Sequence, residues 1–247
     1  MQEILKQVQN DREKKMKKKY KHLFFDFDDT LWDLTTNSYV ALREVFDKYE
    51  LNRFFSDFDQ FYTLYTVNNK YLWELYPKGL ITKKELNQER FLNPLSQAGC
   101  NDAGLAYRIS EDYIEICPTK TALKPHAIEL LEYLRPNYNI HILTNGFVKT
   151  QQIKMQSCGI GGYFDNIYFS EIIGFLKPDK RIFEYAVKSS NARKSESIMI
   201  GDNFEADIAG AKNAGIHQIY VAPDEMPNLP FSPTYVVQSL LEIKKIL

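Results

Sequence analysis

Residues 23–30 are LFFDFDDT, an apolar run that leads directly into closely spaced carboxylates. Leu23, Phe24 and Phe25 are typical of a short buried strand that Asp26 ends, and Asp28 follows on the loop leaving it. The ends of strands in open α/β sheets are where such folds place their chemistry. Two carboxylates this close repel each other unless a positive charge lies between them, and a divalent cation with oxygen ligands is the simplest solution. The stretch therefore predicts a metal-assisted carboxylate site.

Beyond residue 120 the chain alternates helices and strands. Apolar runs predict strands over 139–144, 166–170, 197–202 and 218–222, and helical spacing predicts helices over 125–135, 147–158, 179–190, 205–214 and 240–247. Strands that alternate with helices are typical of a parallel sheet covered on both faces. The expected fold class is α/β, with a doubly wound parallel-sheet core.

The region between the first strand and residue 120 has helical spacing throughout. Thr82 with Glu85 and Ser56 with Asp59 have the spacing of capping boxes, and Pro94 is expected to kink or split its helix. We therefore predict a core of residues 20–35 and 121–247, an all-helical cap of residues 36–120, and a polar extension of residues 1–19.

The bulk composition limits the function class and the partners. A formal net charge of −1 over 247 residues argues against nucleic acid or a membrane surface as partner. There is no apolar run near the roughly 20 residues that span a bilayer, and no secretory signal is expected. The three cysteines have no metal or redox spacing, which favours the cytoplasm. The sequence predicts neither the oligomeric state nor the role of the lysine-rich start, within which Met16 is an alternative first residue.

Four polar clusters lie at predicted strand ends or helix starts: Asp26 with Asp28, Thr144 with Asn145, Lys177, and Asp202 with Asp207. The carboxyl ends of neighbouring parallel strands meet at one edge of a sheet, so these side chains are expected to converge. They belong to the motifs DFDDT (26–30), LTNG (143–146), KPD (177–179) and GDNFEAD (201–207). In this order the motifs resemble the haloacid dehalogenase-like phosphohydrolase superfamily, which often carries a cap between the first two. The start FFDFDDTLWD and the aromatic insertion are most similar to the YjjG-like pyrimidine nucleotide phosphatases.

The resemblance implies roles for two aspartates of the first motif, Asp26 and Asp28. Asp26 is the expected nucleophile, which forms an aspartyl-phosphate and also binds the metal. Asp28 is the expected general acid, and its backbone carbonyl is expected to bind the metal. The dehalogenases of the superfamily lack an aspartate at this position, so Asp28 favours phosphate chemistry. Asp29 is expected to point elsewhere, as a turn or flap residue with a structural rather than a catalytic role.

The later motifs are expected to supply the phosphate and metal ligands. The Thr144 hydroxyl and the Asn145 backbone N–H are candidate donors to the phosphoryl oxygens. Lys177 is expected to neutralise Asp26 and the phosphate. Asp202 is the expected side-chain ligand of Mg²⁺, and Asp207 is expected to orient the water molecules of the metal.

The expected function is Mg²⁺-dependent hydrolysis of a small-molecule phosphate monoester, with a nucleoside monophosphate favoured. Trp73, in the aromatic stripe of the insertion, is a candidate for stacking on a base, although such stripes more often form hydrophobic core. A sugar-phosphate phosphatase and a phosphomutase remain open alternatives. A non-enzymatic alternative is a Mg²⁺-binding phospho-receiver, although receivers are shorter and have no use for Asp28.

Overall fold

The computed structural model describes residues 19–225 and 228–247, which form two compact units. One unit, the core, combines the described residues before Leu34 with Leu123–Leu247, and the other, the helical unit, is Leu34–Ala122. The sequence placed the boundaries of the insertion at about 36 and 120. Residues 1–18, which include most of the lysine run and Met16, lie outside the described part of the chain, so the predictions for them stay predictions.

The core is built on a sheet of six parallel strands among the described residues, in the order β3-β2-β1-β4-β5-β6. The strands are β1 (His22–Phe25), β2 (Asn139–Thr144), β3 (Asn166–Phe169), β4 (Ser197–Gly201), β5 (His217–Val221) and β6 (Tyr235–Val237). The first strand lies in the middle of the sheet, so its carboxyl end has a strand end on either side. The predicted α/β fold with a parallel sheet is confirmed.

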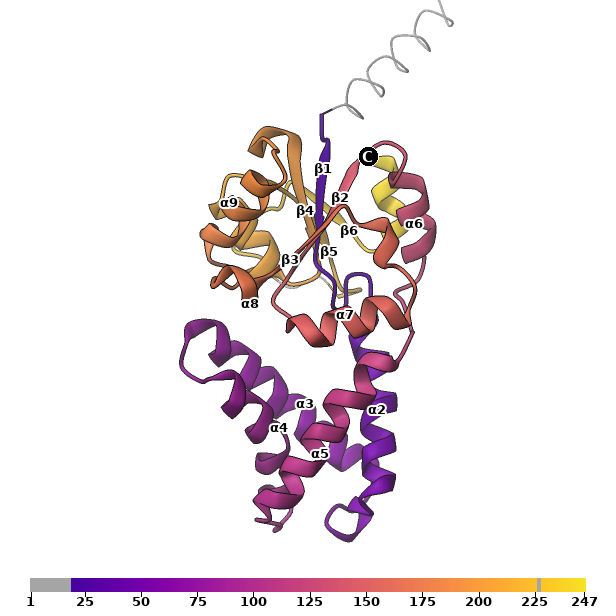
Figure 1. The fold of residues 1–247 in the computed structure, drawn as a ribbon, viewed down its shortest axis with the longest axis vertical. Helices are drawn as coiled ribbons and strands as arrows, with labels where there is room; N and C mark the ends of the chain where they lie inside the picture. Colours follow the sequence, from indigo (N-terminus) through magenta and orange to yellow (C-terminus); the bar gives the residue numbers. More distant parts are fainter. Residues whose placement is uncertain (1–18, 226–227) are drawn as a thin grey trace, which may run out of the picture. The chain divides into compact units, whose positions relative to one another are not determined.

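Helices cover both faces of this sheet, and Figure 1 shows α9 on one side of it and α6 on the other. The core helices are α6 (Ala127–Leu134), α7 (Val148–Ser157), α8 (Ser170–Ile173), α9 (Lys180–Ser189) and α10 (Gly210–Asn213). A π-helical segment, η6 (Phe204–Ala209), precedes α10, and short 3-10 segments are η4 (Gly161–Tyr163), η5 (Lys194–Glu196) and η7 (Leu240–Lys245). Each connection from β1 to β5 contains at least one helix, and β6 follows β5 without a helix in the described residues and also runs parallel to it.

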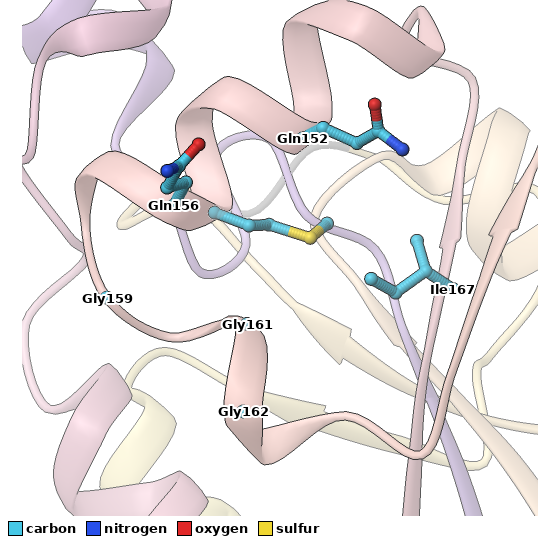
Figure 2. A pocket seen from close by; sticks show the side chains of 7 residues that line it. Gln152, Gln156, Gly159, Gly161, Gly162 and Ile167 are labelled. Carbon is cyan, nitrogen blue, oxygen red and sulfur yellow. The ribbon is translucent and has the colours of Figure 1, made fainter.

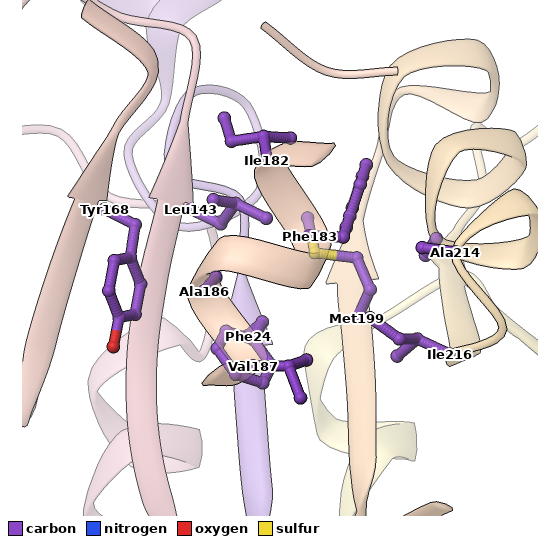
Figure 3. Packing of buried hydrophobic residues seen from close by; sticks show 11 residues of the cluster. Phe24, Leu143, Tyr168, Ile182, Phe183, Ala186, Val187, Met199, Ala214 and Ile216 are labelled. Carbon is purple, nitrogen blue, oxygen red and sulfur yellow. The ribbon is translucent and has the colours of Figure 1, made fainter. Parts of the chain in front are cut away.

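Side chains of one sheet face pack against α9 and α10 to form a hydrophobic core (Figure 3). Phe24, Leu143 and Met199, from three neighbouring strands, meet Ile182 and Phe183 of α9, and all five are almost fully buried. Because side chains alternate between the faces of a strand, Phe24 points to this layer while Leu23 and Phe25 point to the other. This burial fixes the orientation of β1 and therefore the position of Asp26 at the edge of the sheet.

Several elements of the core differ from the sequence prediction, among them the unpredicted α8 and the π-helical first part of the predicted helix over 205–214. Two further differences are β6 and the closing segment. Strand β6 was not predicted, because it has three residues, and its exposed Val236 gives little alternation between buried and exposed positions. The closing segment, η7, is a 3-10 helix that ends at Lys245, where an α-helix was expected to Leu247. Neither difference affects the strand ends that carry the predicted residues.

The helical unit contains α2 (Leu34–Lys48), α3 (Phe58–Leu75), α4 (Lys83–Gln97) and α5 (Ala103–Ile116). Short 3-10 segments lie at η1 (Leu51–Arg53), η2 (Tyr76–Lys78) and η3 (Cys117–Thr119). None of the helices formed by residues 19–225 and 228–247 has the length and apolar character needed to cross a membrane.

The helix starts in this unit test the capping predictions. Thr82 and Glu85 form the predicted capping box at the start of α4. The predicted box of Ser56 with Asp59 is wrong by one position. Asp57 caps α3 by accepting the Gln60 N–H, and the Gln60 side chain accepts the Ser56 N–H. Pro94 does not split its helix, since α4 continues to Gln97.

Candidate active site

Three carboxylates meet at the carboxyl edge of the sheet. Asp26 follows β1, Asp202 follows the neighbouring β4, and Asp207 lies in η6. The two strands end level with each other, because Phe25 pairs with Ile200 and the Asp26 N–H donates to the Ile200 carbonyl over 2.8 Å. One oxygen of each of the three carboxylates lies within 4.8 Å of the others. The three side chains are close enough to share one cation.

Lys177 joins two of these carboxylates. Its Nζ lies 2.6 Å from Asp26 Oδ1 and 2.6 Å from Asp207 Oδ1, and its side chain is 2% exposed. The structure therefore places Lys177 against Asp26, where the sequence expected it. Asp207 was expected to orient the water molecules of a metal, which stays a prediction, and its carboxylate pairs with Lys177 inside the cluster.

The close approach of Asp207 depends on Gly201, the last residue of β4. A Cβ atom at position 201 would lie 2.3 Å from Asp207 Oδ2 and 2.5 Å from its Cγ. Any side chain at this position would occupy the space that the carboxylate now fills. The absence of a side chain at Gly201 thus allows Asp207 to be fully buried at this edge.

Thr30 is a member of the cluster that sequence reasoning did not assign. Its hydroxyl donates to Asp202 Oδ1 over 2.7 Å, and its oxygen accepts the Asp202 N–H over 3.1 Å. Thr30 is fully buried, so this reciprocal pair fixes the direction of the Asp202 carboxylate. The sequence could have indicated Thr30, because it is the polar residue that ends the DFDDT motif.

Burial makes the negative charge of this cluster costly. It raises the pKa of Asp26 well above its ordinary range, against the opposing effect of the Lys177 ammonium. Burial, together with the charge of Asp207, also raises the pKa of Asp202 to about 7, although the Thr30 hydrogen bond acts in the opposite direction. Burial disfavours the charged form of Lys177, but the carboxylates of Asp207 and Asp26 outweigh it and raise its pKa. Within the described residues, three carboxylates therefore face this one ammonium, and a divalent cation would neutralise the excess charge.

Asp28 lies on a tight loop, and its side chain is not part of the carboxylate cluster. Asp29 has a left-handed backbone with φ of 57°, and the N–H groups of Leu31 and Trp32 both donate to the Phe27 carbonyl. The expectation of Asp29 as a turn residue agrees with this geometry. The Asp28 carboxylate is held by Gln151 and Lys154 of α7, at 2.7 and 2.6 Å. Neither α7 residue was singled out from the sequence.

The end of β2 supplies the predicted polar pair. The Thr144 oxygen accepts the Gly146 N–H over 2.9 Å. The Asn145 side chain donates to the Lys177 carbonyl over 2.9 Å and accepts the Lys177 N–H over 2.8 Å. Sequence reasoning expected only the backbone N–H of Asn145 to act. Its side chain ties the Lys177 loop to the end of β2.

Trp73 lies in α3 of the helical unit. Its ring stands edge-on to Tyr76, with centroids 5.8 Å apart and planes at 85°, and it is partly exposed. The fully buried aromatic residues of the unit, such as Phe61 and Tyr65, form its hydrophobic core instead. A role for Trp73 in substrate binding stays a prediction.

A pocket of about 390 Å³ lies beside α7 and is separate from the carboxylates (Figure 2). It is lined by Gln152, Met155, Gln156, Gly159, Gly161, Gly162 and Ile167. This lining contains no charged side chain, and none of the predicted site residues is in it. The pocket and the carboxylate cluster are therefore two distinct places in the core.

Known proteins resemble the chain over nearly its whole length. A model of the haloacid dehalogenase-like hydrolases matches residues 20–215. The pyrimidine 5'-nucleotidase YjjG of Escherichia coli is 35% identical over 232 residues, which cover 93% of this chain and 98% of the nucleotidase. The pyrimidine 5'-nucleotidase PynA of Streptococcus pneumoniae is 30% identical, over 91% of this chain and 93% of its own length.

A solved structure also resembles the chain over nearly its whole length. The HAD-hydrolase YfnB from Bacillus subtilis, in a crystal structure bound to magnesium, superimposes with a TM-score of 0.83 and 28% identity, over 93% of this chain and 99% of that protein. The predicted superfamily is confirmed, and so is the enzyme class, a phosphoric monoester hydrolase. Because the family match includes all four motifs that converge at the carboxyl edge of the sheet, the chain belongs to the haloacid dehalogenase-like hydrolase family.

Proposed function

We propose that this hydrolase cleaves phosphate monoesters with the help of Mg²⁺ and through an aspartyl-phosphate on Asp26. One observation carries the proposal: the Asp26 carboxylate ends the central strand, pairs with the buried Lys177 ammonium and shares its surroundings with two further carboxylates. A nucleophile for phosphorus needs positive charge beside it, since the incoming phosphate is an anion. Lys177 supplies one such charge.

The donor set fits Mg²⁺. It consists of carboxylate oxygens without histidine or cysteine, which suits a hard cation. We assign Asp26, Asp202 and the Asp28 backbone carbonyl as the groups that would hold it, with Asp207 beside them. When bound, the cation neutralises the carboxylates and stabilises charge on the phosphoryl oxygens. This accords with the raised pKa values of Asp26 and Asp202, which reflect buried negative charge in need of a partner.

The chain's own residues then perform two displacements. A carboxylate oxygen of Asp26 forms a bond to phosphorus as the bond from phosphorus to the leaving oxygen breaks, and Asp28 gives that oxygen a proton. In the second step Asp28 takes a proton from a water molecule, whose oxygen attacks phosphorus and releases Asp26 and inorganic phosphate. The Thr144 hydroxyl, the Asn145 N–H and Lys177 hold the phosphoryl oxygens.

We propose a nucleoside monophosphate as the substrate. The names of YjjG and PynA as pyrimidine 5'-nucleotidases support this choice. The partly exposed Trp73 offers an aromatic face in the helical unit. The small number of cysteines, three in 247 residues, supports a cytoplasmic location.

A panel of phosphate monoesters tests the proposal. The purified full chain is incubated with Mg²⁺ and pyrimidine monophosphates, hexose phosphates or a small aryl phosphate, and inorganic phosphate is measured. We expect the highest kcat/KM for a pyrimidine monophosphate. Preference for hexose phosphates would favour a sugar-phosphate phosphatase. An isomerised sugar phosphate would identify a phosphomutase, and a single phosphorylation without turnover would identify a receiver.

A further inference from the structure

Helix α7 presents two buried polar side chains that the proposed reaction does not yet use. Gln151 is completely buried and Lys154 is 4% exposed. They are three positions apart in the helix, so they share a face. A buried ammonium and a buried amide each destabilise a fold unless other groups compensate them. The groups that compensate Gln151 and Lys154 therefore indicate the role of these two side chains.

Both side chains hold the Asp28 carboxylate. Lys154 Nζ lies 2.6 Å from Asp28 Oδ1, and Gln151 Nε2 lies 2.7 Å from Asp28 Oδ2. The Lys154 ammonium also lies 4.1 Å from the centroid of the Trp32 ring, which favours a cation over its face. Both oxygens of the proposed general acid are thus fixed from one helix.

Gln151 also reaches the proposed phosphate ligand. Its Nε2 donates to Thr144 Oγ1 over 3.0 Å, and the same oxygen accepts the Gly146 N–H. With two donors on its oxygen, the Thr144 hydroxyl keeps its own hydrogen for a third group. This is the arrangement that a donor to a phosphoryl oxygen needs.

The backbone at Gly146 makes room for this contact. A Cβ atom at position 146 would lie 1.8 Å from Gln151 Nε2 and 2.6 Å from its Cδ. The glycine of the LTNG motif thus leaves the space that the Gln151 amide fills. The Gln151 side chain thus connects α7 to the end of β2 by a specific contact.

We propose that Gln151 and Lys154 are positioning residues of the hydrolase, an inference that rests on the proposed function. Lys154 holds Asp28 in the orientation in which it gives a proton to the leaving oxygen. Gln151 holds Asp28 and at the same time turns the Thr144 hydroxyl toward the phosphoryl group. A different face of α7, with Gln152 and Gln156, lines the pocket of Figure 2 and takes no part.

Two substrates with different leaving groups separate the two roles. The leaving oxygen of p-nitrophenyl phosphate departs with little need for a proton, whereas that of uridine monophosphate, an alkyl phosphate, needs one. We expect Lys154→Met to lower kcat for uridine monophosphate about a hundredfold, the effect of a ~1 Å misplacement of a reacting group, with KM little changed. For p-nitrophenyl phosphate we compare the first turnover, in which p-nitrophenol is released before the aspartyl-phosphate is hydrolysed, and we expect a loss of less than about tenfold because Asp28 acts as a base only in the second step.

The Gln151 variant is expected to behave differently. Gln151→Glu keeps the size of the side chain but replaces its donor by a carboxylate facing Asp28. It disturbs Thr144 as well as Asp28, so kcat is expected to fall for both substrates, by about tenfold or more. Lys149→Met is the matched control, because Lys149 lies in the same helix but is exposed. Thermal unfolding of each variant is recorded to follow its stability.

Each result decides between the possibilities. If the unmodified protein hydrolyses neither substrate, the proposed function itself is wrong. If it hydrolyses both and Lys154→Met leaves uridine monophosphate turnover intact, the positioning role is wrong. An equal loss in the first turnover of both substrates in Lys154→Met would overturn the positioning role, and a lowered melting temperature beside it would show that Lys154 only supports the fold. Should Lys154→Met fail to fold, wild-type turnover of both substrates by Gln151→Glu would overturn the proposal.

Discussion

Replacing Gly201 by alanine is expected to displace Asp207 and weaken the carboxylate cluster. The new Cβ would lie 2.3, 2.5 and 2.7 Å from Asp207 Oδ2, Cγ and Cβ, respectively. Atoms without a bond between them rest at about 3.5 Å, so the side chain has to move by about 1 Å. Rotation of the carboxylate is not sufficient, because the Asp207 Cβ is also too close.

The size of the effect follows from the contacts that Asp207 would lose. These are the ion pair with Lys177 at 2.6 Å and the hydrogen bond from the Asn203 N–H at 3.1 Å. Breaking a buried pair costs about 3–5 kcal/mol, and the retained pair of Lys177 with Asp26 favours the lower end. The reduced freedom of the unfolded chain returns about 0.4–1 kcal/mol. We expect a loss of about 3 kcal/mol in unfolding free energy, or roughly 6–12 °C in Tm for a chain of this length.

Urea unfolding followed by circular dichroism, in metal-free buffer, measures this loss, and phosphate release measures the activity. The matched control is Gly162→Ala, because a Cβ at this exposed position meets nothing within 4 Å. The control is expected to stay within about 0.5 kcal/mol of the wild type. If Gly201→Ala is equally stable and fully active, the reasoning from the close approach of Asp207 is refuted.

The remaining predictions concern the nucleophile, the metal, a buried histidine and substrate choice. Asp26→Asn should keep the fold, as judged by circular dichroism, and lose nearly all turnover, at about 1.4 kcal/mol of barrier per tenfold; wild-type turnover would exclude Asp26 as the nucleophile. Chelation with EDTA should abolish phosphate release and added Mg²⁺ should restore it, whereas activity that survives thorough chelation would contradict the metal assignment. Burial beside His22 lowers the pKa of His141 to about 4 from 6.5, so the unfolded chain binds the proton first and stability falls as pH falls through this range, by at most about 3 kcal/mol. Urea unfolding at pH 7.5 and pH 5 should show a smaller difference in His141→Asn than in the wild type, and an equal difference would refute this. Trp73→Ala should change the ranking of nucleotides and sugar phosphates more than the hydrolysis of a small aryl phosphate, and a substrate panel with an unchanged ranking would count against a role in recognition.

The sequence predicts the residues at strand ends well, because their signal is local. Asp26 and Asp202 each follow an apolar run, and a parallel sheet brings the ends of such runs together whatever the length of the intervening chain. Lys177 has no strand before it, and only its motif pointed to the site. For Asp26, Asp202 and Lys177, the order of the motifs in the sequence and the position in the fold both indicate the same edge of the sheet.

The residues that were missed act through geometry that the sequence pattern does not show. Gln151 and Lys154 lie in the middle of a helix, so their contact with Asp28 depends on how α7 is rotated and where it docks. Thr30 was overlooked because a small hydroxyl beside three aspartates carries little signal of its own. The capping box at α3 was placed one residue early, since Ser56 and Asp57 are both good caps and only the backbone angles select Asp57.

The Lys154 ammonium stacked on Trp32 also gives the protein a built-in optical reporter. Trp32 is fully buried and lies in the same loop as Asp28, whereas Trp73, the only other tryptophan in the sequence, belongs to the helical unit. The emission of an indole depends on the charges near its ring. In a Trp73→Phe background, tryptophan fluorescence arises from Trp32 alone, so we expect a shift of Lys154 or Asp28 to be visible in real time. The two displacements could then be followed in a stopped-flow instrument without any attached dye.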